Sequence, residues 1–192
     1  MWEKFSEWDR ELFVYLNNLG VEEYDTFWIF VTQIRHWIPL YILFFVLFFI
    51  AFPWRKALLS TFATILTAIT IIGLTDFVKI RVARLRPNNQ PLLEDLIRIL
   101  QKPDNFSFFS GHSASSFAIT TVVVLILRKK YKWVYVFYIW PLLFASSRIF
   151  VGVHYPADVL VGAGVGVFTA YLIYLLFTFS ANKFLHQNKY SQ

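Results

Sequence analysis

The sequence contains no cysteine and few charged residues for a chain of 192. Without cysteine the protein has no disulfide framework and no zinc site built on thiolates. Only 16% of its residues are charged, while 57% are hydrophobic and 20% are aromatic. Soluble domains carry about a quarter charged residues. The composition therefore excludes a soluble domain and predicts a single integral membrane domain over residues 1–192.

Acidic residues are scarce too, with 12 against 18 lysines and arginines, and the net charge is +6. A basic chain can bind nucleic acid, but these cations are scattered between apolar stretches and do not form one long stripe. We therefore expect no nucleic-acid partner. The expected surroundings of the chain are the lipid bilayer.

Five apolar stretches reach or approach the length of about 20 residues that a helix needs to cross a bilayer. They cover residues 37–52, 57–77, 112–127, 133–147 and 159–179. The first can be extended backward through "FWIFVTQI". The sequence thus predicts an all-α, polytopic helical bundle with five transmembrane helices, or six if the N-terminal segment also crosses.

The N-terminal segment, residues 2–16, has apolar residues three and four positions apart. These are Trp2, Phe5, Trp8, Leu12 and Leu16. That spacing is typical of an amphipathic helix lying in the membrane interface. A second pattern, "GAGVG" at 162–166, places two glycines four residues apart, which favours close packing between helices.

Basic residues suggest how the bundle is oriented. If residues 37–52 cross once, three basic segments fall on one face, namely "PWRK" (53–56), "RKKYK" (128–132) and the tail "NKFLHQNK" (182–189). Cytoplasmic loops are enriched in lysine and arginine, so this face is the cytoplasmic one. The segment "KIRVARLR" (79–86) breaks the rule, because it places cations on the outer face. Topology does not require them there, whereas a bound anion would.

Three polar segments reach that outer face at the same depth, because each lies an even number of crossings from the others. The cluster comprises Lys79, Arg81, Arg84 and Arg86, then Ser110, Gly111 and His112, then Arg148, His154 and Asp158. One charge at membrane depth costs about 2.5–3.5 kcal/mol on insertion scales. Such a cluster is therefore a candidate functional site.

The residue types in this cluster suit phosphoryl transfer. Arginine and lysine match the oxygens of a phosphate, and Gly111 at a helix start lets backbone N–H groups approach an anion. Of two histidines, one can attack phosphorus while the other protonates the departing alcohol. Asp158 follows His154 by four residues and is placed to hold one of its ring nitrogens.

Three motifs, "KIRVARLRP" (79–87), "FSGH" (109–112) and "SRIFVGVHYPAD" (147–158), resemble the signature of the type 2 phosphatidic acid phosphatase superfamily. The signature of that superfamily reads K-x6-RP, PSGH and SR-x5-H-x3-D. The matching positions are Lys79, Arg86 and Pro87; Ser110, Gly111 and His112; and Ser147, Arg148, His154 and Asp158.

The resemblance implies a role for each matching residue. His154 would be the nucleophile that forms a phosphohistidine, Asp158 would orient it, and His112 would be the general acid. The phosphate-binding residues would be Lys79, Arg86, Ser110, Gly111 and Arg148. No cofactor and no metal are expected. A two-metal phosphatase is the alternative, but it needs several converging carboxylates, and only Asp158 is well placed.

Two features depart from the signature or lie outside it. Phe109 stands where the family usually has proline. Proline would stiffen the turn before the third span, so its replacement removes a rigid residue but no catalytic group. Arg81 and Arg84 are not part of the pattern. Two interpretations are open for them, namely steering of anionic lipids and contact with lipid phosphates at the interface.

An outward-facing site on a short membrane chain favours a lipid phosphate that enters sideways from the bilayer. The resemblance to small bacterial members of the superfamily places the protein in the bacterial cytoplasmic (inner) membrane, with its active site facing the periplasm or exterior. Undecaprenyl diphosphate is the favoured substrate, because recycling this lipid carrier to undecaprenyl phosphate is the most general task for such a small outer-face enzyme. Phosphatidic acid, phosphatidylglycerol phosphate and the phosphates of lipid A are alternatives that no residue excludes.

Two further classes are open. A soluble vanadate-dependent haloperoxidase would use the same oxyanion site, but apolar spans argue against it. A non-catalytic protein that binds or translocates a lipid phosphate would keep the cations, although it would not need both His112 and His154. The sequence indicates no oligomeric state.

Overall fold

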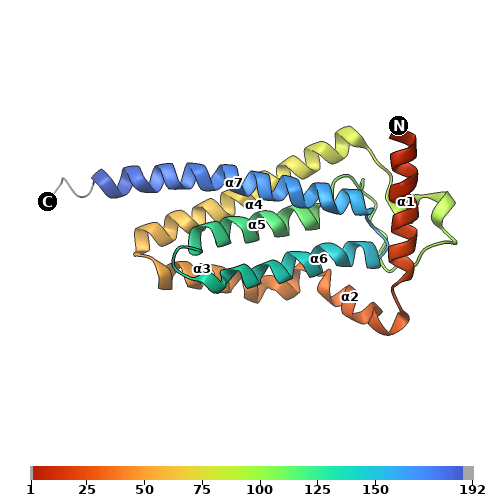
Figure 1. Ribbon diagram of the computed structural model, residues 1–192, viewed down its shortest axis with the longest axis horizontal. Coiled ribbons are helices and arrows are strands. Elements are labelled where there is room, and N and C mark those ends of the chain that lie inside the picture. The colour runs from red at the N-terminus through yellow and green to blue at the C-terminus, as the bar shows by residue number, and fades with distance from the viewer. Residues whose placement is uncertain (1, 188–192) are drawn as a thin grey trace.

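The computed structural model describes residues 2–187, which form helices and turns without a strand. The helices are α1 (Trp2–Asn18), α2 (Asp25–Val31), α3 (Ile38–Ala51), α4 (Trp54–Val82), α5 (Gly111–Leu127), α6 (Ile139–Phe150) and α7 (Pro156–Gln187). Short 3-10 turns are η1 (Glu22–Tyr24), η2 (Ile34–Trp37), η3 (Pro87–Asn89), η4 (Pro91–Leu93) and η5 (Lys132–Tyr138). Helices α3 to α7 form a bundle, and α1 lies crosswise over one end of it (Figure 1).

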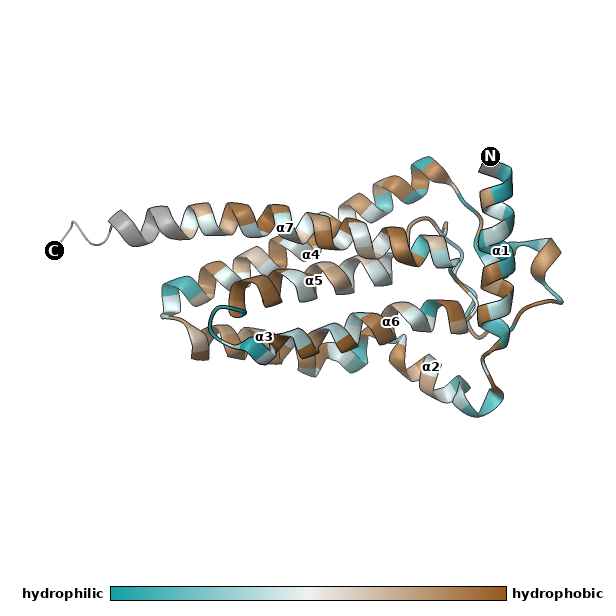
Figure 2. Cartoon of the chain, viewed as in Figure 1, coloured by the Kyte–Doolittle hydropathy of each residue, from teal (hydrophilic) through white to brown (hydrophobic). Residues whose placement is uncertain are grey.

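Four helical stretches are long and apolar enough to cross a membrane. They are Ile34–Ala51, Trp54–Leu93, Lys132–Phe150 and Pro156–Ala181, and Gly111–Leu127 is a shorter apolar helix. Apolar residues cover the length of the bundle, whereas α1 and the turn between α3 and α4 are more polar (Figure 2). The predicted all-α polytopic bundle is confirmed, with four to five spans.

The N-terminal part of the chain contributes no further span among the described residues. The backward extension of the first span is wrong, because α2 ends at Val31 and Gln33 is extended before η2 begins. The turn between α3 and α4 and the turn after α5 both lie at the end of the bundle opposite α1 (Figure 1). Both basic loops of the sequence therefore fall at one end, as the pattern predicted.

Helix α5 occupies the centre of the bundle, in contact with α3, α4, α6 and α7. Its 17 residues span about 25 Å at 1.5 Å per residue, less than the roughly 30 Å of a hydrocarbon core. Most of its side chains are buried against protein rather than lipid. The N-cap Ser110 is fully buried as well, while Gly111 and His112 at the start of the helix are partly buried.

Helices α5 and α7 approach each other closely because of the first and last glycines of the "GAGVG" pattern, Gly162 and Gly166. A Cβ atom on Gly162 would lie 2.7 Å from the carbonyl oxygen of Ser110, and one on Gly166 would lie 2.3 Å from that of Ala114. The Ser113 hydroxyl also donates to the carbonyl of Val159 at 2.7 Å. The packing interpretation of these glycines is confirmed.

Helix α1 docks through a face that the apolar spacing did not indicate. Phe13 is fully buried, with its ring centroid 5.4 Å from that of Tyr155. Asp9 and Asn17, one turn on either side of Phe13, are buried too. Phe5, Trp8 and Leu12 instead remain exposed, which leaves an apolar outer face of the kind that interfacial helices carry.

The glycine contacts lead to a test of the α5–α7 packing. Gly166→Ala places a methyl group against the backbone of α5, so we expect it to destabilise the fold by about 1–3 kcal/mol. Gly164 has no atom within 4 Å of a built Cβ, so Gly164→Ala is the matched control and keeps or slightly raises the melting temperature, because alanine favours a helix more than glycine does. The measurement is thermal unfolding in detergent, and equal melting temperatures for both variants would contradict this packing.

Candidate active site

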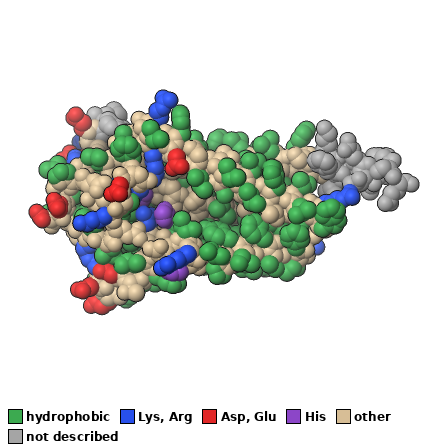
Figure 3. Space-filling model, turned by 180° about the vertical axis from the view of Figure 1, so that it is seen from behind, with side chains coloured by type: hydrophobic (Ala, Val, Ile, Leu, Met, Phe, Trp, Pro, Cys, Tyr) green, Lys and Arg blue, Asp and Glu red, His purple; other side chains and the backbone are tan. Residues whose placement is uncertain are grey.

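Charged side chains and histidines gather at the end of the molecule that α1 covers, while the sides of the bundle are largely hydrophobic (Figure 3). Three segments supply the polar residues there. They are the end of α4 with the loop after it, the start of α5, and the connection from α6 to α7. These are the segments that the sequence predicted would converge.

The first segment turns sharply after α4. Lys79 is buried in the last turn, and Ala83 takes a left-handed conformation with φ of 50° that ends the helix. Beyond it the chain is extended at Arg86 (φ −74°, ψ 155°), as expected for a residue that precedes proline. The turn therefore brings Arg86 back over the bundle end, where its side chain is buried.

The second segment begins α5. Ser110 is the N-cap, and its hydroxyl oxygen accepts from the Ser113 N–H at 3.4 Å. Gly111 and His112 form the first turn, and the His112 ring lies 4.8 Å from that of Phe144 on α6. Phe109, in place of the proline of the signature, is buried in the hydrophobic core. Its side chain is thus held by packing.

The third segment holds a histidine and a carboxylate in direct contact. Pro156 is the first residue of α7, as the sequence predicted, and His154 lies just before it. His154 Nδ1 is 3.3 Å from Asp158 Oδ2, with exposed fractions of 1% and 0%. The Asp158 carbonyl also accepts from the Ser110 N–H at 3.0 Å. The second and third segments are therefore joined through Asp158.

The protonation pattern of His154 follows from its neighbours. Arg86 Nη1 is 3.0 Å from His154 Nε2, and a guanidinium can only donate. Nε2 is therefore the acceptor, and Nδ1 carries the hydrogen that it donates to Asp158. Burial, then the positive charge of Arg86 and next that of Arg148, lower the pKa of His154 well below its ordinary value. The ring is consequently neutral, and its Nε2 carries the lone pair that accepts from Arg86.

Arg148 is nearly fully buried on α6. Its Nη1 donates to the Thr32 hydroxyl and, at 3.1 Å, to Gln101 Oε1. Its Nε is buried without a hydrogen-bond partner in the described part of the chain. With Lys79 and Arg86, it gives this end of the bundle an excess of buried positive charge. Buried cations are costly unless paired, so the arrangement suits an anion.

A sequence model of the PAP2 superfamily matches residues 56–181, which is more than half of the chain. The chain belongs to the PAP2 superfamily. It is also similar to proteins named as lipid phosphatases. A lipid A 4'-phosphatase of Bacteroides thetaiotaomicron is 30% identical over 182 residues, 92% of this chain and 80% of that protein.

Two other proteins extend the comparison. An undecaprenyl-diphosphatase of Sulfolobus acidocaldarius is 30% identical over 109 residues, 56% of this chain and 50% of that protein. A crystal structure of a transmembrane PAP2 type phosphatidylglycerolphosphate phosphatase from Bacillus subtilis shares the fold. It aligns with a TM-score of 0.71 at 22% identity, covering 88% of this chain and 84% of that chain. The expectation that this PAP2 chain is a lipid phosphatase is confirmed.

Two residues, Arg84 and Asp9, contact the candidate site in a way that the sequence did not reveal. Arg84 donates from Nη1 to Asp158 Oδ1 and from Nη2 to Asp9 Oδ2, both at 2.7 Å. Both interpretations offered for Arg84 are wrong, because its charge is engaged inside the protein. Arg81 is exposed, with its guanidinium 5.0 Å from the Phe77 ring.

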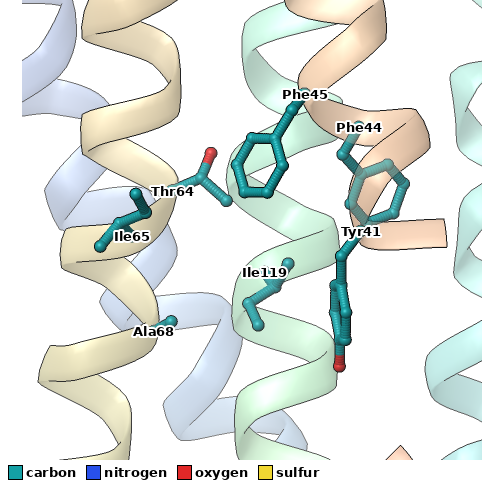
Figure 4. A pocket seen from close by; sticks show the side chains of 7 residues that line it. All are labelled: Tyr41, Phe44, Phe45, Thr64, Ile65, Ala68 and Ile119. Atoms are coloured by element: carbon teal, nitrogen blue, oxygen red, sulfur yellow. The ribbon is translucent and has the colours of Figure 1, made fainter. Parts of the chain in front are cut away.

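An apolar pocket of about 290 Å³ lies elsewhere, between α3, α4 and α5 (Figure 4). It is lined by Tyr41, Phe44, Phe45, Thr64, Ile65, Ala68 and Ile119. Ala68 precedes Lys79 by eleven residues on the same helix, which corresponds to about 16 Å. The pocket is therefore separate from the polar PAP2 site and has no lining cation.

The buried cations predict that the PAP2 site binds a phosphate-shaped anion. We expect orthovanadate to raise the melting temperature of the protein in detergent, because a ligand that binds only the folded state stabilises it. Arg148→Gln should remove most of that increase. Arg81→Gln, on an exposed arginine of the same face, should keep it. An increase that Arg148→Gln retains in full would argue against anion binding at this arginine.

Proposed function

We propose that this chain hydrolyses a lipid phosphate at the outer face of the bacterial cytoplasmic membrane, through a phosphohistidine on His154. The observation that carries the proposal is the environment of His154 Nε2. That nitrogen is neutral, is oriented through Nδ1 by Asp158, and lies 3.0 Å from a buried arginine. The proposed nucleophile, His154 Nε2, and a cation able to bind phosphate, Arg86, are therefore adjacent.

The proposed first step forms the bond between His154 Nε2 and phosphorus while the bond from phosphorus to the lipid oxygen breaks. Arg86, Arg148 and Lys79 neutralise charge on the phosphoryl oxygens, with help from the N–H groups at the start of α5. His112 gives a proton to the departing oxygen. Asp158 offsets the positive charge that develops on the His154 ring.

The proposed second step returns the enzyme to its starting state. Water attacks phosphorus, the bond to His154 Nε2 breaks, and His112 takes the proton that the water loses. The products are inorganic phosphate and the lipid alcohol, or the lipid monophosphate where the substrate is a diphosphate. Neither step uses a metal. Among the side chains that the structure describes, no three from His, Asp or Glu are grouped as ligands for one.

For the substrate, we propose the phosphate of a lipid A-type glycolipid. The relative named for lipid A matches 92% of this chain, whereas the one named for undecaprenyl diphosphate matches 56%. The sequence alone favoured undecaprenyl diphosphate. We place it second because the relative named for that lipid matches a smaller part of this chain. Both substrates place a phosphate at the membrane surface, where the site lies.

The orientation in the membrane is part of this proposal. The basic turns at the far end of the bundle support a cytoplasmic location for that end. The site would then face the periplasm or the exterior, on the leaflet where both candidate lipids are exposed. The cations of the site sit outside the positive-inside pattern, which fits their use in binding phosphate.

The nucleophile assignment gives the first test of the proposed function. We expect His154→Ala to lower phosphate release by about 10³-fold or more, since the loss of a nucleophile removes the whole covalent route. His36→Ala is the matched control. His36 is partly buried, and its side chain contacts Phe30 through Nδ1 and through its ring, away from the polar cluster, so this variant should keep wild-type turnover. Normal release by His154→Ala would rule out a phosphohistidine at this position.

The substrate assignment is tested with the detergent-purified protein and excess chelator. Phosphate release is measured side by side from lipid A, undecaprenyl diphosphate and phosphatidic acid, with His154→Ala as the blank. We expect the highest kcat/KM for lipid A. Faster phosphate release from undecaprenyl diphosphate would instead assign the protein to recycling of that lipid carrier. Faster phosphate release from phosphatidic acid would assign it to glycerolipid metabolism. Activity that the chelator abolishes and a divalent metal restores would overturn the mechanism.

A further inference from the structure

A row of four ionisable side chains runs from the N-terminal helix to the proposed nucleophile. Asp9 on α1 pairs with Arg84 after α4, Arg84 pairs with Asp158 on α7, and Asp158 contacts His154. The two arginine contacts are each 2.7 Å long. The side chains of Asp9 and Asp158 are 4% and 0% exposed, and that of Arg84 is 22% exposed.

Arg84 fixes how the Asp158 carboxylate is turned. Asp158 Oδ2 accepts from His154 Nδ1 and from the Tyr155 N–H at 3.0 Å. The other oxygen, Oδ1, accepts from Arg84 Nη1. A carboxylate held at both oxygens cannot rotate without breaking a charged contact. The orientation of His154 toward a phosphate therefore depends on Arg84 through Asp158.

Asp9 in turn fixes Arg84. Its Oδ2 accepts from Arg84 Nη2, and its Oδ1 accepts from the Ala157 N–H at 2.9 Å, in the first turn of α7. The guanidinium lies 3.9 Å from the Tyr155 ring, which supports it from one side. Asp9 thus clamps the arginine to the same helix start that carries Asp158.

The second carboxylate also has an electrostatic effect. One guanidinium shared between two carboxylates leaves a net negative charge on the three groups together. Asp158 consequently retains more of its negative charge toward His154 than it would if Arg84 paired with it alone. That charge is needed when the His154 ring becomes positive on bonding to phosphorus.

We infer that Asp9 and Arg84 are positioning residues for the proposed phosphatase reaction, acting on His154 through Asp158. The inference rests on the proposed function. It makes α1 a part of the catalytic apparatus, although Asp9 lies outside the residues 56–181 that the superfamily model matches. Neither residue is expected to touch the substrate, because their charged atoms are occupied by each other and by α7.

The test is a double-mutant cycle on kcat, with KM measured alongside. Arg84→Gln should lower kcat by about 10²-fold, the size expected when a reacting group is misplaced by about 1 Å, with little change in KM. Asp9→Asn, a nearly isosteric change, should lower it by roughly tenfold. In an Asp158→Asn background, Arg84→Gln should have almost no further effect, since residues that act as one unit are non-additive. Single-turnover assays with labelled lipid give the rates of the slow variants.

The matched control is Asn17→Ala. Asn17 is also buried on α1, but its amide joins the helix to the backbone of Arg98 and Ile149 and makes no contact with Asp158. This variant should lower the melting temperature while keeping kcat within about twofold of wild type. An equal fall in kcat for Asn17→Ala and Asp9→Asn would show that docking of α1 is what matters, and would overturn the inference.

The remaining outcomes separate this inference from the proposed function. Wild-type kcat in folded Asp9→Asn and Arg84→Gln proteins overturns the inference and leaves the phosphatase assignment intact. Additive losses from Arg84→Gln and Asp158→Asn overturn it as well, because Arg84 would then act independently of Asp158. If the wild-type protein released no phosphate, the proposed function itself would be contradicted.

Discussion

The buried carboxyl group of Asp158 is the constraint on which the arrangement of this site depends. A carboxylate without exposure to solvent must be paired and hydrogen-bonded. Asp158 meets that requirement with His154, the Tyr155 N–H and Arg84, and its backbone carbonyl accepts from Ser110. The loop after α4, the start of α5 and the start of α7 are thus held together at one residue.

The packing of the bundle makes these contacts possible. The close approach of α5 and α7 at Gly162 and Gly166 places the start of α5 beside the start of α7. The first N–H groups of a helix have no partner within that helix. An anion is the natural partner for those groups, and the buried arginines increase that preference.

Membrane and catalytic requirements are met by different parts of the chain. The long apolar faces of α3, α4, α6 and α7 are suited to contact with lipid, and the polar end that α1 covers carries the residues of the proposed chemistry. In the proposed function, a site at one end of the bundle would have access to water for the hydrolytic step. It would also reach the phosphate of a membrane lipid whose chains stay in the bilayer.

The sequence by itself determined the apolar spans, the all-α class and the three polar motifs, because hydropathy and motif spacing are local properties. It also identified Arg86, His154 and Asp158 as residues that would meet, since the count of crossings fixes which ends share a depth. The roles of these residues stay a prediction.

Only the tertiary structure decided that Arg84 is engaged by Asp158 and Asp9. The apolar spacing of α1 pointed away from its buried face, and no local pattern shows that a carboxylate about 75 residues earlier in the chain will pair with an arginine. Such a pairing depends on how α1 docks, and docking is a property of the assembled surface.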